Sequence, residues 1–176
     1  TGARMTDIVQ RLPLRTKLTY GFGAVAYGIK DNGFATFLLF YYNPVVGMRA
    51  DLVSLAIALA LIADAFIDPM VGHWSDKTRT RIGRRHPWLY ASVIPIAITW
   101  ILLWHPPAMS EWETFGYLFL TAMFLRIAFS AYEVPSLALL PELSRDYHDR
   151  TAIMRYRFLF GWGGGLAIMF LAYAVF

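Results

Sequence analysis

The sequence predicts an all-α membrane protein, a bundle of transmembrane helices. Of its 176 residues 57% are hydrophobic and only 16% are charged, whereas soluble domains carry about 25% charged residues. The mean hydropathy is +0.46. Many of the aromatic residues, 16% of the chain, lie near the ends of apolar runs, as membrane-interface residues do. The chain has no cysteine, which excludes disulfides and cysteine metal sites.

Five apolar segments are long enough to cross a bilayer, which takes roughly 20 residues of helix. Prolines and charges separate them, as at Asn43-Pro44, Pro106-Pro107 and the run SDKTRTRIGRR. Residues 1–17 have no apolar core, so we expect a cytoplasmic N-terminus there rather than a signal peptide. The predicted transmembrane bundle covers 18–176, with spans at about 18–42, 52–73, 88–105, 114–139 and 157–176.

The basic residues predict the orientation of these spans, because cytoplasmic loops are enriched in Lys and Arg. All but three of the 16 basic residues precede the first span or follow the second and fourth spans. The exceptions are Arg49 in an opposite loop and Lys30 and Arg126 inside spans. This placement explains a pI near 9.5 without nucleic acid as a partner. The residues on the cytoplasmic side are Arg4, Arg11, Arg15, Lys17, Lys77, Arg79, Arg81, Arg84, Arg85, Arg145, Arg150, Arg155 and Arg157.

Six charged residues lie inside the apolar segments, where charge is costly. Each costs roughly 2.5–3.5 kcal/mol near the middle of a bilayer, so six facing lipid would cost on the order of 15 kcal/mol. We therefore expect them to face the interior of the bundle or a water-filled cavity and to pair there. The six residues are Lys30, Asp31, Asp64, Asp68, Arg126 and Glu133.

Asp64 and Asp68 are four positions apart, so a helix places them on one face, one turn apart. Two carboxylates this close resist joint ionisation, and the pair is suited to bind Na⁺ through its oxygens or to take up a proton. Arg126 and Glu133, seven positions apart, are placed to line one cavity. Two alternatives stay open: a structural ion pair for Arg126, and a place in the headgroup region for Asp68, which precedes Pro69.

Other residue patterns indicate structure rather than chemistry. Glycines in the first and fifth spans are expected to allow close helix packing, because no strand precedes them as in a nucleotide-binding loop. The histidines lie near the membrane edges without ligand spacing, so no metal site is expected beyond Na⁺ at Asp64 and Asp68. We find no nucleophile–base pair and expect no enzyme and no cofactor. The glycines are Gly21, Gly23, Gly28, Gly33, Gly161, Gly163, Gly164 and Gly165, and the histidines are His73, His86, His105 and His148.

The loop after the second span places a glycine at a helix end, an acid one turn later and then a basic cluster. It resembles the major facilitator superfamily signature G-x-x-x-D-[RK]-x-G-[RK]-[RK], with four extra residues before the Gly-Arg-Arg. The resemblance implies a gate on the cytoplasmic side, whereas the alternative is ordinary positive-inside charge. The residues concerned are Gly72, Asp76, Lys77, Gly83, Arg84 and Arg85.

The longer form of this loop narrows the resemblance. The stretch DPMVGHWSDKTRTRIGRRHPW resembles the glycoside–pentoside–hexuronide:cation symporters, the melibiose permease-like branch of that superfamily. The stretches KLTYGFGAVAYGIKD and YEVPSLALLPELSRDYHDRTAIMRYR resemble its first helix and the region from its fourth to its fifth helix. The resemblance implies the first five of twelve helices in a major facilitator-type bundle. The chain would then be an N-terminal portion truncated before the sixth helix, with a C-terminal half as its partner.

The resemblance also implies roles for single residues. Asp64 and Asp68 match the acids that bind the coupling cation. Two positions depart from the family. Ile67 replaces an asparagine that helps to hold Na⁺, so H⁺ coupling is at least as plausible as Na⁺ coupling. Leu137 replaces a tryptophan that packs on the sugar ring. The residues expected at the substrate site are Lys30, Asp31, Glu133, Arg157 and Arg126.

The function expected from the resemblance is secondary active transport. The protein would be a multi-pass protein of the bacterial inner (plasma) membrane that couples H⁺ or Na⁺ to symport of a sugar or glycoside by alternating access. Two alternatives stay open: a lipid or lysophospholipid symporter of the same superfamily, and a non-transporting membrane scaffold or receptor.

Overall fold

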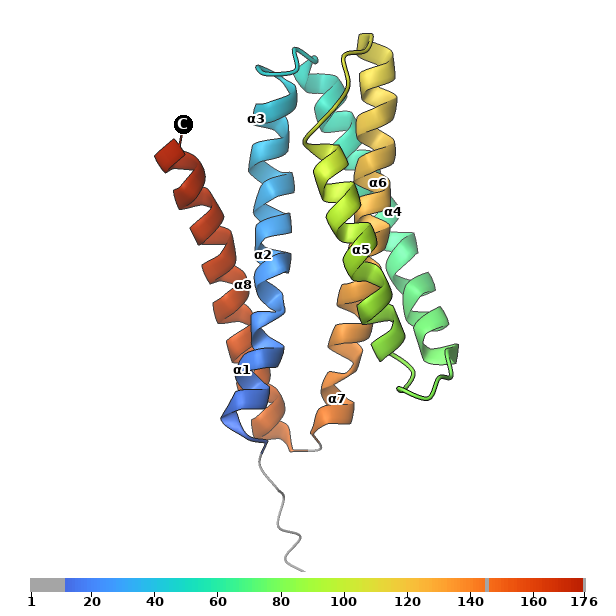
Figure 1. The fold of residues 1–176 in the computed structure, drawn as a ribbon, viewed down its shortest axis with the longest axis vertical. Helices are drawn as coiled ribbons and strands as arrows, with labels where there is room; N and C mark the ends of the chain where they lie inside the picture. Colours follow the sequence, from blue (N-terminus) through green and yellow to red (C-terminus); the bar gives the residue numbers. More distant parts are fainter. Residues whose placement is uncertain (1–11, 145, 176) are drawn as a thin grey trace, which may run out of the picture. The chain divides into compact units, whose positions relative to one another are not determined.

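The computed structural model describes residues 12–144 and 146–175, and every element in these ranges is helical (Figure 1). The expectation of an all-α fold is thus confirmed. Three of the cytoplasmic basic residues predicted above, Arg4, Arg11 and Arg145, lie outside these ranges. The elements are α1 (Leu14–Phe22), α2 (Ala24–Asn32), the π-helix η1 (Gly33–Phe37), α3 (Leu38–Tyr42), α4 (Ala50–Lys77), α5 (His86–Leu103), α6 (Glu111–Ala138), α7 (Leu140–Leu143) and α8 (Tyr147–Val175).

Four helical stretches in the described ranges are long and apolar enough to cross a membrane: Ala50–Lys77, His86–Leu103, Glu111–Leu143 and Tyr147–Ala174. They coincide with the second to fifth predicted segments, and most extend beyond the apolar runs. The fifth begins ten positions early, because charged residues such as Asp149 and Arg150 continue its helix outside the apolar part. The division into a cytoplasmic N-terminus and a membrane bundle stays a prediction.

The first predicted segment is divided among α1, α2, η1 and α3 instead of forming one long α-helix. Glycine, a poor helix former, stands at two of the junctions, Gly23 and Gly33. A Cβ atom at Gly33 would lie 2.7 Å from Cη2 of Trp100. The glycine therefore lets the indole ring pack on the helix backbone where the π-helix starts. Whether this segment crosses the membrane stays a prediction.

The chain forms two compact units, and the first contains residues 1–32 and 140–176. Its described helices α1 and α2 pack along α8 (Figure 1). A Cβ atom at Gly28 would overlap the carbonyl oxygen of Gly161, and one at Gly164 would lie 2.9 Å from the carbonyl oxygen of Val25. The close packing expected from the glycines is confirmed at these positions. Gly163 is an exception, because nothing lies within 4 Å of a Cβ atom built there.

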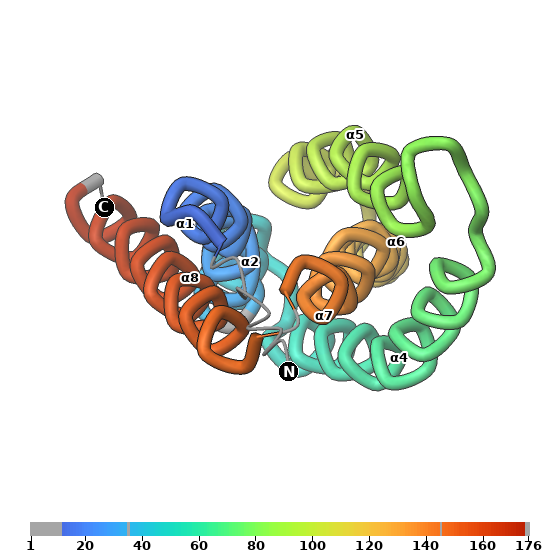
Figure 2. The backbone as a smooth tube through the Cα atoms, turned by 90° about the horizontal axis from the view of Figure 1, so that it is seen from below, coloured from blue at the N-terminus to red at the C-terminus, as the bar shows by residue number. Residues whose placement is uncertain are grey.

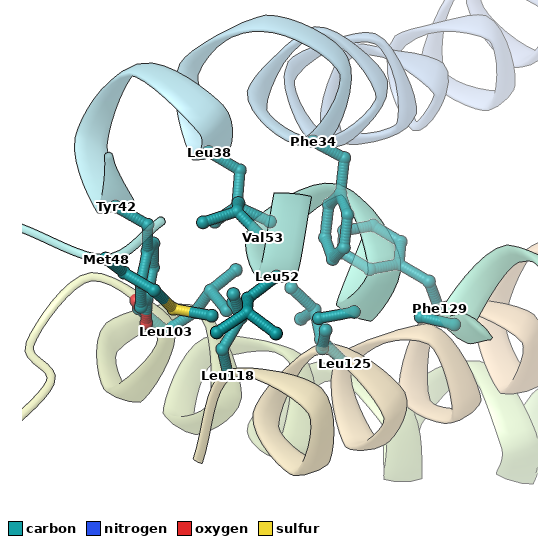
Figure 3. Packing of buried hydrophobic residues seen from close by; sticks show 13 residues of the cluster. Phe34, Leu38, Tyr42, Met48, Leu52, Val53, Leu103, Leu118, Leu125 and Phe129 are labelled. Carbon is teal, nitrogen blue, oxygen red and sulfur yellow. The ribbon is translucent and has the colours of Figure 1, made fainter. Parts of the chain in front are cut away.

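The second unit contains residues 33–139. Here α6 packs against both α4 and α5, between which it lies in Figure 2. A buried apolar cluster, drawn in Figure 3, joins η1, α3, α4, α5 and α6. Burial of these side chains supplies the main stabilising term of such a core in water, and close packing supplies it in lipid. The cluster comprises Phe34, Leu38, Tyr42, Met48, Leu52, Val53, Ala56, Ala60, Leu103, Leu118, Ala122, Leu125 and Phe129.

Three tyrosine hydroxyls donate hydrogen bonds to backbone carbonyls at one end of this unit. Tyr117 donates to the carbonyl of Leu102 at 2.7 Å, Tyr42 to that of Leu103 at 2.7 Å, and Tyr41 to that of Trp104 at 2.9 Å. The last carbonyls of a helix have no partner within the helix. The tyrosines donate to these carbonyls at the end of α5. Tyr42 is 0% exposed, so water cannot replace it as the donor.

Candidate functional site

The polar residues of α4 meet α6 in a regular series. Arg126 donates through Nη1 to Oδ2 of Asp64, and the hydroxyl of Ser130 donates to Oδ1 of Asp68. The partners are 62 positions apart in both pairs. A steady separation over four residues of each helix means that α4 and α6 run parallel and in register. The sequence prediction that Asp64 and Asp68 share a face is therefore confirmed, and that face is turned toward α6.

Arg126 is the most enclosed charge of this series, with 6% of its surface exposed. Its guanidinium lies 4.8 Å from the centre of the Phe34 ring, a cation–π geometry. Phe34 belongs to η1, so three elements of the second unit surround the guanidinium. The Nε atom of Arg126 and the Oδ1 atom of Asp64 are buried and have no hydrogen-bond partner in the described residues. A polar ligand or water at this position could accept a hydrogen bond from Nε of Arg126 and donate one to Oδ1 of Asp64.

The remaining predicted residues of this unit lie on the same two helices. Asp68 is exposed, whereas the Asp64 side chain keeps 24% of its surface. Glu133 is half-buried on α6, seven positions after Arg126. Ile67 and Leu137, the two departures from the family pattern, present hydrocarbon at their positions. The roles of Asp64, Asp68 and Glu133 in binding a cation or substrate stay predictions.

The first unit holds the other predicted substrate residues. The ammonium of Lys30 lies 4.8 Å from the centre of the Tyr27 ring. Asp31, the next residue, is exposed. Arg157 is 6% exposed, and its guanidinium lies 5.3 Å from the centre of the Tyr20 ring. Both cations thus sit against aromatic faces within their own unit. A common cavity for these residues and those of the second unit stays a prediction.

The signature loop contains an ion pair and a glycine with a positive φ angle. Arg85 donates through Nη2 to Oδ1 of Asp76 at 2.9 Å, which joins the end of α4 to the start of α5. Gly83 has φ +103°, a conformation that side chains with a Cβ disfavour. A Cβ atom at Gly72 would lie 3.5 Å from Val134 of α6. Lys77 and Arg84 are exposed. The ion pair stabilises the local conformation of the loop. The role of the loop as a gate stays a prediction.

Sequence reasoning missed two polar residues that the structure uses. Ser130 is four positions after Arg126, so helix geometry alone predicts that the two side chains lie on one face. A serine in a helix, however, carries no distinctive signal of a functional role. Asp149 is 2% exposed and accepts the backbone N–H of Leu12 at 2.8 Å and the ammonium of Lys17 at 2.6 Å. An acid in the first turn of a helix is common for electrostatic reasons alone, so its long-range partners were not predictable.

Comparison with known proteins identifies the family of the chain. Residues 19–176 match the family described as MFS/sugar transport protein, where MFS denotes the major facilitator superfamily. The chain belongs to this family. The uncharacterized symporter sll1374 of Synechocystis sp. is 34% identical over 92% of this chain and 31% of its own length. The isoprimeverose transporter of Lactiplantibacillus pentosus is 27% identical over 92% of this chain and 34% of its own length. The sodium-dependent lysophosphatidylcholine symporter 1 of Gallus gallus is 30% identical over 88% of this chain and 29% of its own length.

Membership of the family determines the class of protein. Together with the four apolar helical stretches of the described residues, it makes the chain part of an integral membrane protein of the major facilitator superfamily. The relatives named above are transporters, which move their cargo rather than convert it. The chain spans about a third of the length of these curated relatives.

Proposed function

We propose that the chain is part of a secondary active transporter that couples H⁺ or Na⁺ to the symport of a sugar or glycoside across a bacterial plasma membrane. The observation that carries the proposal is the shared face of Asp64 and Asp68, which lies against Arg126 and Ser130 in the middle of apolar helices. An isoprimeverose transporter among the relatives supports a sugar as cargo. A further transmembrane half of the same protein would complete the transporter.

The carboxylate pair provides the coupling step. Charged groups inside a membrane are costly, so a cavity that exposes an uncompensated carboxylate to closing apolar walls resists closure. Binding of one cation or proton at Asp64 or Asp68 removes that charge. The free-energy cost of closing the cavity therefore falls only when the coupling ion is bound. This couples the movement of the substrate to the movement of the ion.

The substrate would be held by the other polar residues. Asp31 and Glu133 accept hydrogen bonds from sugar hydroxyls, and Lys30 and Arg157 donate to them. Tyr27 and Tyr132 offer aromatic faces. Arg126, also expected to contact the substrate, has its Nη1 engaged by Asp64 in this structure. The loop from Gly72 to Arg85, with its Asp76–Arg85 pair, would open and close the cytoplasmic side.

Uptake into proteoliposomes tests the proposal. The full-length protein is reconstituted and supplied with a panel of labelled sugars, while Na⁺ and pH gradients are varied separately. We expect one gradient to drive accumulation and the Asp64→Asn/Asp68→Asn variant to lose it. Asp51→Asn, an exposed acid at the start of the same helix, is the matched control and should accumulate normally. Uptake that ignores both gradients would contradict the proposal.

A second cargo is favoured by one relative, the lysophosphatidylcholine symporter. The same vesicles therefore receive labelled lysophosphatidylcholine. Gradient-driven movement of this lipid, with no sugar accumulated, would replace the sugar by a lysophospholipid and keep the coupling mechanism. A scaffold or receptor would move neither cargo, and its activity would survive the Asp64→Asn/Asp68→Asn change.

A further inference from the structure

The position of Arg126 bears on which ion the carboxylate pair accepts, and the inference below rests on the proposed function. A guanidinium stays protonated under all ordinary conditions. It therefore brings a permanent positive charge to the pair. Its enclosure is strong, because only 6% of its surface is exposed and the Phe34 ring covers one side.

The charges of the series do not cancel. Asp64 is matched by Arg126, whereas the partner of Asp68 is the neutral hydroxyl of Ser130. Helix α6 also carries the acid Glu133. Arg126 therefore compensates only one carboxylate of the pair, and the negative charge of Asp68, the more exposed of the two, is left for a mobile cation.

The guanidinium competes with a metal ion for the carboxylate of Asp64. Hard cations are bound through several oxygen ligands at once. Oδ2 of Asp64 is engaged by the guanidinium, and position 67, next to Asp68, is the hydrocarbon side chain of Ile67. The buried and unpartnered Oδ1 of Asp64 becomes useful to a metal ion only when the guanidinium withdraws.

We propose that Arg126 is a tethered cation that occupies the place of a metal ion at Asp64, and that it thereby keeps Na⁺ from binding there. Arg126 acts as a specificity-determining residue through its permanent charge. Its removal opens Asp64 to Na⁺, so a single substitution converts a protein that ignores Na⁺ into one that binds it.

Equilibrium binding of radioactive Na⁺ to the full-length protein in detergent, at neutral pH and without substrate, tests this proposal. We expect Arg126→Gln to bind Na⁺ at least about tenfold more tightly than the wild-type protein, because no cation opposes its entry. Arg126→Lys keeps the charge and should bind Na⁺ as weakly as the wild-type protein. The variant Arg126→Gln/Asp64→Asn should lose the Na⁺ binding that Arg126→Gln gains.

Two results would overturn the proposal. One is wild-type protein that binds Na⁺ as tightly as Arg126→Gln, and the other is Na⁺ binding in Arg126→Gln that persists after Asp64→Asn. If Arg126→Gln does not fold, the Na⁺ affinity of the wild-type protein relative to Arg126→Lys still decides, since tight Na⁺ binding by both refutes a tethered cation. The binding measurement needs no substrate, so it tests this inference independently of transport. Failure of the proposed function would instead appear as the absence of gradient-driven uptake.

Discussion

The Asp64–Arg126 pair should show its energetics in a double-mutant cycle. The variants are Asp64→Leu, Arg126→Leu and the two together. Removing one member of a buried ion pair leaves an uncompensated charge and costs about 3–5 kcal/mol, whereas replacing both by apolar residues is close to neutral. The double variant should therefore be more stable than either single variant.

The surroundings of each partner set the expected magnitudes. Arg126 is 6% exposed, so Asp64→Leu leaves an almost fully buried guanidinium without its counter-charge, at about 4 kcal/mol of lost unfolding free energy. The Asp64 side chain is 24% exposed, so water partly solvates the carboxylate that Arg126→Leu leaves, and the charge penalty is nearer 3 kcal/mol. This variant also loses the contact with Phe34, worth about 0.5–2 kcal/mol.

Denaturant unfolding of the full-length protein in detergent micelles, followed by tryptophan fluorescence, measures these free energies. The exposed pair Arg49–Asp51, whose side chains keep 67% and 61% of their surface, is the matched control. The same cycle there should give a much smaller coupling, because water screens an exposed ion pair. If the losses of Asp64→Leu and Arg126→Leu simply add in the double variant, the two charges do not stabilise one another and our reasoning is wrong.

Three further predictions concern stability, each read from the midpoint of thermal unfolding and converted to free energy. Tyr42→Phe leaves a buried carbonyl without its donor and should cost about 1–3 kcal/mol; Tyr117→Phe, at a more exposed hydrogen bond, should cost less, and equal losses would contradict the capping argument. Gly28→Ala forces α2 and α8 apart and should cost about 1–3 kcal/mol, whereas Gly163→Ala has open space and should gain up to about 1 kcal/mol from helix propensity; a reversed order would refute the close packing. Asp149→Asn removes the charge that holds the start of α1 and should cost about 1.5–3 kcal/mol; an unchanged midpoint would show that this contact carries no stability.

The helical fold was readable from the sequence because length and hydropathy are local properties. A run such as 52–73 can satisfy its backbone in lipid only as a helix, and a helix is what the structure contains there as part of α4. The first segment was harder to predict. Its π-helix starts where Trp100, which is distant in sequence, packs on Gly33. The pattern of residues within the segment does not predict that contact.

The candidate site divides in the same way. The spacing of Asp64 and Asp68 places them on one face whatever surrounds the helix, so their common direction followed from helix geometry alone. The choice of Arg126 as the partner of Asp64 required a second helix, parallel and in register, 62 positions along the chain. Tertiary packing sets that register, because it depends on how the apolar surfaces of α4 and α6 fit, and a linear pattern of charges holds no information about that fit.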